Sequence, residues 1–169
     1  MVRLTAFAVA AYCFLQPGLA PAQDTARQLV GSWKLTAWTI QIIDGEATQP
    51  FGPNPKGILV LAANGQYAQI IVHPDRPNFK VNNRLEGTPE ENTAAVHGTT
   101  ATFGTWSVDE ANKTITVRNE GSMFPNQVGT ESKRSVTLQG DQLRVSNPTP
   151  ASGGRSESVW KRGPTFASK

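Results

Sequence analysis

Polar and apolar residues alternate along the chain in short runs that end at turn-forming residues. Thr, Val, Ile and aromatic residues fill the runs, and Gly, Pro, Asn and Asp separate them, a pattern typical of β-hairpins. The dipeptide Asn64-Gly65 is a strong hairpin signal, because it tolerates the positive φ angles of a tight turn. The pattern predicts eight strands, over residues 31–43, 57–63, 66–73, 101–108, 114–119, 132–139, 142–146 and 156–162.

The alternation stops between residues 74 and 98. Within this segment, Thr88-Pro89-Glu90-Glu91 resembles a capping box with proline at the first helical position. We therefore expect a short helix over residues 89–97, between the third and fourth strands. Asp44-Gly45 is expected to close the first strand with a turn, and the prolines of residues 51–55 indicate a rigid loop.

The first predicted strand is apolar on both of its sides. One side would carry Trp33, Leu35 and Ala37, and the other Trp38, Ile40 and Ile42. A flat sheet would leave two open edges and one face in water, whereas closing the sheet removes the edges. Short connections favour neighbouring antiparallel pairs, so we predict an all-β fold: an eight-stranded up-and-down antiparallel β-barrel. Eight strands leave an interior wide enough for side chains or one small ligand.

The N-terminal residues are typical of a signal peptide. A short basic end is followed by an apolar run over residues 4–15 and by the small residues Ala20 and Ala22. The run is too short to span a membrane. We expect cleavage after Ala22, a barrel domain over residues 23–169, and secretion or export to the periplasm, without stable membrane insertion. Cys13 is the only cysteine, so the mature protein would contain none.

Composition and motifs exclude several classes of function. Without Arg3, 15 basic and 13 acidic residues leave a net charge of +2, and the basic residues are scattered, so no nucleic-acid partner is expected. Two histidines without cysteine make no convincing zinc motif, and no metal or cofactor is expected. The chain also lacks a Gly-x-Ser-x-Gly elbow, a phosphate-binding loop and a dinucleotide fingerprint. The sequence does not predict an oligomeric state.

Several segments, in order, resemble the lipocalin-like domain family of bacterial and fungal proteins. They are Leu29-Val30-Gly31-Ser32-Trp33, residues 50–57, Pro74-Asp75-Arg76-Pro77, Gly104-Thr105-Trp106-Ser107-Val108, and residues 121–126 with Gly129-Thr130. Gln127 departs from the pattern, where the resemblance implies a bulky aromatic residue. The resemblance implies the barrel fold far more than any particular activity.

A Gly-x-Trp sequence at the start of the first strand is also shared with lipocalins. Here it is Gly31-Ser32-Trp33, and the last predicted strand ends in Trp160-Lys161-Arg162. The resemblance implies that Trp33 packs at the closed end of the barrel and that Arg162 stacks over it in a cation–π contact. We therefore expect structural roles for Gly31, Trp33, Trp106 and Arg162.

Alternation in the third strand offers a candidate cavity wall. Tyr67, Gln69, Ile71 and His73 share one side, which combines apolar area with a few polar groups, as small-molecule cavities do. We assign this side to the interior, with a solvated outer face as the alternative. The aromatic residues Phe51, Phe79, Phe103 and Phe124 lie near strand ends, from which they can line or plug the open mouth.

The segment His73-Pro74-Asp75-Arg76-Pro77 gathers an imidazole, a carboxylate and a guanidinium where a strand leaves the sheet. Arg76 can bind a carboxylate through two hydrogen bonds, and His73 can transfer protons near neutral pH. The alternative is ordinary turn chemistry between prolines. His97 would lie at the end of the helix, where an imidazolium interacts favourably with the helix dipole.

These observations favour a secreted or periplasmic protein that binds a small hydrophobic or amphipathic molecule inside the barrel. The predicted ligand-binding residues are Tyr67, Gln69, Ile71, His73, Arg76, Phe79, Phe103 and Phe124. The alternative is an isomerase, cyclase or lyase, in which His73, Asp75 and Arg76 transfer protons or stabilise charge in the same cavity.

Overall fold

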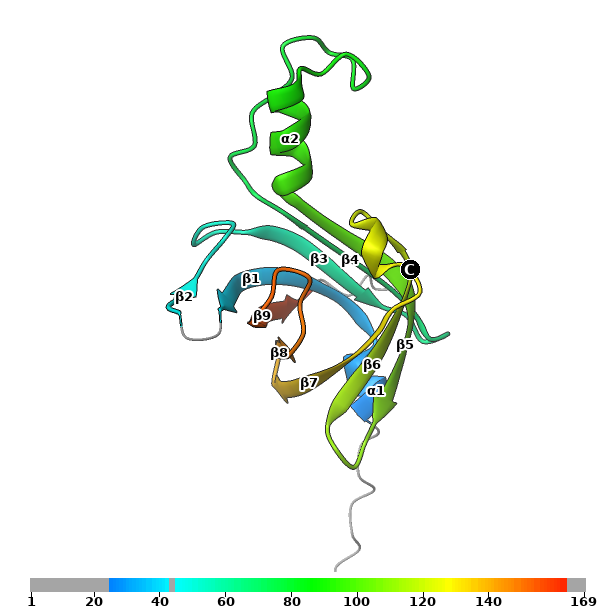
Figure 1. The fold of residues 1–169 in the computed structure, drawn as a ribbon. Coiled ribbons are helices and arrows are strands. Elements are labelled where there is room, and N and C mark those ends of the chain that lie inside the picture. Colours follow the sequence, from blue (N-terminus) through cyan, green and yellow to red (C-terminus); the bar gives the residue numbers. More distant parts are fainter. Residues whose placement is uncertain (1–24, 43–44, 164–169) are drawn as a thin grey trace, which may run out of the picture.

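The computed structural model describes residues 25–42 and 45–163 (Figure 1). Its elements are α1 (Thr25–Leu29), β1 (Gly31–Gln41), β2 (Ala47–Thr48), β3 (Lys56–Leu61), β4 (Gln66–Val72), α2 (Pro89–His97), β5 (Thr99–Asp109), β6 (Thr114–Ser122), the 3₁₀ helix η1 (Pro125–Gln127), β7 (Glu131–Gln139), β8 (Gln142–Asn147) and β9 (Arg155–Arg162). The predicted signal peptide and Asp44 lie outside the described residues. Among the described helices, none is both long and apolar enough to cross a membrane.

The eight long strands form the predicted closed antiparallel barrel. Each long strand pairs with the next one along the chain, and β1 pairs with both β3 and β9. The β1–β9 ladder runs from the pair Trp33 and Arg162 to the pair Gln41 and Arg155, and this ladder closes the sheet. The two-residue strand β2, which the sequence pattern did not predict, adds to the far end of β1.

A β-bulge in β1 explains why that strand is apolar on both sides. The register against β9 shifts between Leu35 and Ala37, so the inward side changes along the strand. Trp33 and Leu35 are buried before the bulge, and Ile40 is buried after it. The predicted barrel is confirmed. The two apolar sides of β1 do not face opposite sides of the sheet, because each half of the strand points its own apolar residues to the interior.

The end of the barrel where β1 begins is closed by α1. The Trp33 side chain is fully buried, and its indole Nε1 donates to the Leu29 carbonyl at 2.9 Å. The guanidinium carbon of Arg162 lies 4.1 Å from the centroid of the Trp33 ring, which is the predicted cation–π contact. Arg162 also donates to the carbonyls of Gln28 and Val30, which lie at the end of α1 and just after it.

The hydrophobic core fills the end of the barrel nearest α1 and extends toward the other end, where Phe51, Ile71 and Val145 belong to it. Trp106 belongs to it, and its Nε1 donates to the Ala62 carbonyl at 3.0 Å. The buried cluster consists of Leu29, Trp33, Leu35, Phe51, Leu59, Leu61, Tyr67, Ile71, Trp106, Ile115, Val117, Val136, Leu143, Val145 and Trp160. Since the barrel has no disulfide among the described residues, this packing holds it together.

Helix α2 has the predicted bounds and stands beyond the opposite end of the barrel (Figure 1). The capping box is present, because Glu91 N–H donates to Thr88 Oγ1 and Thr88 N–H donates to Glu91 Oε2. Glu91 Oε1 also accepts from the Lys80 N–H at 2.8 Å. The two backbone N–H groups, of Thr88 and Lys80, lower the pKa of the Glu91 carboxyl below its ordinary value of 4.5. Glu91 thus fastens the preceding loop to the helix.

Candidate functional site

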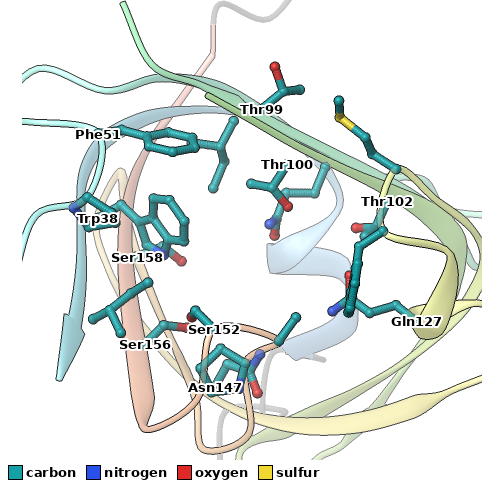
Figure 2. Close-up of a pocket in the computed structure, with 18 of the residues that line it drawn as sticks. Trp38, Phe51, Thr99, Thr100, Thr102, Gln127, Asn147, Ser152, Ser156 and Ser158 are labelled. Carbon is teal, nitrogen blue, oxygen red and sulfur yellow. The ribbon is translucent and has the colours of Figure 1, made fainter. Parts of the chain in front are cut away.

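A pocket of about 610 Å³ occupies the half of the barrel nearest α2 (Figure 2). Its volume lies within the range usual for small-molecule sites. The pocket is lined by Trp38, Ile40, Pro50, Phe51, Gln69, Ile71, Val96, His97, Thr99, Thr100, Thr102, Met123, Phe124, Gln127, Arg134, Val145, Asn147, Pro150, Ala151, Ser152, Ser156 and Ser158. The strands supply the walls, and the connecting segments around Phe51, His97, Phe124 and Ser152 form the rim.

One wall of the pocket is apolar and aromatic. Trp38 and Phe51 meet edge to face, with ring centroids 4.9 Å apart (Figure 2). Ile40 lines the pocket from the same strand as Trp38. Phe51 is 7% exposed, although it lies in a loop. The bulge in β1 turns Trp38 and Ile40 toward the pocket. This wall offers contact area to an apolar ligand body.

Arg134 in β7 is the one arginine or lysine among the described residues that line the pocket. It is 8% exposed; its Nε donates to Ser132 Oγ at 3.1 Å and its Nη1 to Gln69 Oε1 at 3.5 Å. Among the described residues, no carboxylate lines the pocket and no ion pair is made by Arg134. Burial lowers the pKa of the Arg134 guanidinium, but arginine stays protonated in proteins. The pocket therefore holds an uncompensated positive charge.

Thr102 is related to this charge through Gln69, which accepts from Arg134 and pairs directly with Thr102 in the β4–β5 ladder. Thr102 is 7% exposed, and its hydroxyl oxygen has no hydrogen-bond partner in the described part of the chain. Buried hydroxyl groups are usually satisfied by a partner. We call Gln69, Thr102 and Arg134 the polar cluster of the pocket, and the buried Thr102 hydroxyl is its one buried atom without a partner among the described residues.

The residues predicted on β4 have the inward parity that was assigned to them. Gln69 and Ile71 line the pocket, whereas Ile70 on the other side is 45% exposed. Tyr67 is buried in the core, and its hydroxyl donates to Asn119 Oδ1. His73 lies beyond the end of β4, where its ring meets the edge of Phe51 at 5.8 Å. Neither Tyr67 nor His73 lines the pocket.

The segment from His73 to Arg76 forms a turn outside the pocket. His73 Nδ1 accepts from the Asp75 N–H at 3.1 Å, and Arg76 Nε donates to the His73 carbonyl at 3.3 Å. Arg76 Nη1 donates to Thr99 Oγ1 at 2.7 Å, and the carboxylate of Asp75 is exposed. These contacts form a local turn, as in the alternative interpretation, but with His73 rather than the Asp75 carboxylate as the acceptor, and none of the three residues lines the pocket.

The predicted aromatic residues divide between the rim and the outside of the barrel. Phe124 lines the pocket and is 49% exposed. Phe103 lies outside: it is 56% exposed, because it alternates with the inward Thr102, and its ring covers Gly121. Phe79 lies against Gly87 in the loop before α2. Phe79 and Phe103 therefore do not belong to the pocket.

Sequence reasoning missed Arg134, Thr102 and Trp38. The signal for Arg134 was present, because it alternates in register with Val136 and Leu138 on one face of a predicted strand. A charged residue on the same face as two apolar ones points to a functional interior position. Trp38 was hidden by the bulge, which no pattern of alternation reveals.

Among the described residues, no group of three or more His, Cys, Asp or Glu side chains is placed to hold a metal ion. His97 at the end of α2 is exposed at the rim, and it is the only histidine that lines the pocket within the described ranges. The groups that the pocket offers are therefore one guanidinium, one imidazole, amides, hydroxyls and an apolar wall.

The family of the chain follows from its sequence. A model of the lipocalin-like domain matches residues 30–164, and the chain belongs to that family. The match covers all eight long strands of the barrel and begins just after α1. No sequence among the curated proteins matches the chain.

Solved structures with a similar fold span most of the chain. A lipocalin-like protein from Bacteroides uniformis ATCC 8492 is 16% identical with a TM-score of 0.44, covering 80% of this chain and 98% of that one. An uncharacterized protein from Bacteroides eggerthii DSM 20697 is 13% identical with a TM-score of 0.39, covering 79% and 98%. A single-site mutant of the fluorescent protein UnaG is 13% identical with a TM-score of 0.37, covering 81% and 97%.

Proposed function

We propose that the protein binds a small amphipathic molecule in the pocket of the barrel. The observation that carries this proposal is the pocket itself, which combines an apolar wall with a buried guanidinium that has no ion-pair partner among the described residues, inside a closed barrel. A barrel that served only as a packed structural module would fill this half with side chains, as it does in the half near α1.

The segments of the rim suit the entry of a ligand. Met123 and Phe124 are 39% and 49% exposed, and Val96 at the end of α2 is 53% exposed. All three are apolar residues that line the pocket from connecting segments or from the end of a helix. Their apolar surface at the mouth favours partition of an apolar body from water into the barrel.

We also propose that the protein acts outside the cytoplasm, after removal of residues 1–22. The N-terminal pattern of a short basic end, an apolar run and small residues supports this proposal. N-terminal sequencing of the protein from culture medium or periplasm of its own host tests it. A mature N-terminus at Gln23 supports export, and an intact Met1 in a cytoplasmic fraction contradicts it.

Binding can be tested with N-phenyl-1-naphthylamine, an uncharged probe that becomes fluorescent in apolar surroundings. We expect saturable fluorescence with the wild-type protein and its loss in Thr100→Trp, because Thr100 lines the pocket (Figure 2) and the larger side chain would occupy space that the probe needs. Thr105→Trp is the matched control, since Thr105 is exposed on the same strand. Circular dichroism confirms that both variants fold. Equal binding by both variants, or no uptake by the wild type, would contradict the proposal.

A further inference from the structure

The unpaired charge in the pocket indicates what kind of molecule binds there. A buried cation without a counter-ion is costly, so proteins pair such groups or shift their ionisation. Arginine cannot relieve the cost by losing its proton near neutral pH. Arg134 has only neutral partners, Ser132 and Gln69, among the described residues. The missing counter-charge is a property expected of the ligand.

The donors of the polar cluster fit a carboxylate. A guanidinium has five N–H groups in one plane, which match the two oxygens of a carboxylate. Among the described residues, hydrogen bonds use Nε and Nη1 of Arg134, and Nη2 makes none. The hydroxyl of Thr102 is a further donor without a partner, across the ladder from Gln69.

The charge of the pocket favours a monoanion. Arg134 is the one arginine or lysine that lines it in the described part of the chain, and His97 lies exposed at the rim. A phosphomonoester carries close to two negative charges and usually takes more than one cationic partner. One guanidinium balances the charge of one carboxylate.

We propose, building on the proposed binding function, that the ligand is an amphipathic monocarboxylic acid whose carboxylate binds Arg134 and Thr102. Its apolar body lies along Trp38 and Phe51 toward the rim. Arg134 lies where the pocket meets the core, because Val136, two residues along β7, belongs to the buried cluster. The carboxylate thus enters first, and the apolar body follows it.

Two matched fluorescent probes separate this inference from the binding function itself. The probes 1-pyrenebutyric acid and 1-pyrenebutanol share the apolar body and differ only in the carboxylate. We expect the wild-type protein to bind the acid at least 10-fold more tightly than the alcohol at pH 7. A charge-assisted hydrogen bond of about 1.5–3 kcal/mol corresponds to roughly 10- to 150-fold in affinity.

Variants test whether the preference for the acid over the alcohol arises from Arg134 and Thr102. We expect Arg134→Gln to lower the affinity for the acid by about 10- to 100-fold and to change that for the alcohol by less than about 3-fold. Thr102→Val should lower the affinity for the acid by about 3- to 10-fold. The control is Lys133→Gln, because Lys133 neighbours Arg134 but is exposed, and it should leave both affinities unchanged.

The outcomes are distinguishable. Uptake of N-phenyl-1-naphthylamine with equal affinities for acid and alcohol in the wild type overturns the carboxylate site and leaves the binding function standing. The comparison of the two probes needs only the wild-type protein, so it holds even where Arg134→Gln does not fold. If neither pyrene probe nor the uncharged probe binds, both the site and the binding function are overturned.

Discussion

Replacing Arg134 with methionine should stabilise the empty protein. Arg134 is 8% exposed, has no carboxylate partner among the described residues, and makes one of its two hydrogen bonds at 3.5 Å. Methionine is unbranched and of similar length, so it can follow the same path without a charge. Replacing buried ionic groups with apolar ones stabilises some proteins by about 1–4 kcal/mol, and we expect about 1–3 kcal/mol here.

The gain should appear in both chemical and thermal unfolding. At about 3 °C per kcal/mol for a domain of this size, we expect Tm to rise by about 3–9 °C. Equilibrium unfolding in urea, followed by tryptophan fluorescence and far-UV circular dichroism, measures the free energy. Lys133→Met is the control, and this exposed substitution should change stability by less than about 0.5 kcal/mol.

A bound carboxylate ligand should make the wild type more stable than Arg134→Met. Saturating 1-pyrenebutyric acid is expected to raise Tm of the wild type and to leave Tm of Arg134→Met nearly unchanged, because binding to the native state alone stabilises it. A loss of more than about 1 kcal/mol in the empty Arg134→Met variant would refute the reasoning. Arg134 would then stabilise the empty barrel, and its charge would not require a ligand as counter-ion.

Three further substitutions test the fold around the site. Arg162→Met should cost about 2–4 kcal/mol in urea unfolding, through its contact with Trp33 and its bonds to the end of α1, and a loss below about 0.5 kcal/mol would contradict this. Gly121→Ala should cost about 1–3 kcal/mol, because its Cβ would overlap the Phe103 ring, and adding Phe103→Ala should restore most of the loss; additive effects would contradict the contact. Glu91→Gln should remove a stabilisation that is present above the ordinary carboxyl pKa of 4.5 and is lost as the pH falls through the lowered pKa in the native state. Protease sensitivity of the loop before α2, measured from about pH 3 to 7, tests this, and parallel pH profiles for the wild type and the variant would contradict it.

The barrel could be predicted because its signals are local. Alternation located the eight long strands, Asn64-Gly65 located a hairpin, and the capping box located the start of α2, whose predicted end at His97 is also confirmed. The contact between Arg162 and Trp33 joins the first and last long strands, and a resemblance between short motifs was enough to predict it. Each of these features could be predicted because a few residues in short stretches of sequence determine it.

The pocket could be predicted only in part, because its residues come from the whole length of the chain. A bulge reversed the inward side of β1, so Trp38 entered the pocket against the simple alternation. Phe103 was assigned to the mouth by its position near a loop, yet its parity places it outside. The cluster from His73 to Arg76 was assigned by its chemistry, and its side chains are used within a local turn.

The role of Arg134 became apparent only from the fold. Its place between Ser132 and Val136 in the alternation fixes an inward side chain, but only the closed barrel shows that no carboxylate faces it among the described residues. An arginine on a strand is ordinary in a sequence, and an unpaired arginine inside a barrel is uncommon. Only the tertiary structure distinguishes these two cases.

Native mass spectrometry of the protein purified from its own host tests the binding function most directly. We expect a species heavier than the polypeptide by the mass of one small molecule, released as an organic acid on denaturation. The Thr100→Trp variant, prepared in the same way, should carry only the mass of its polypeptide. Wild-type protein that is always free of any bound molecule, and that takes up none from an extract of its host, would contradict the account.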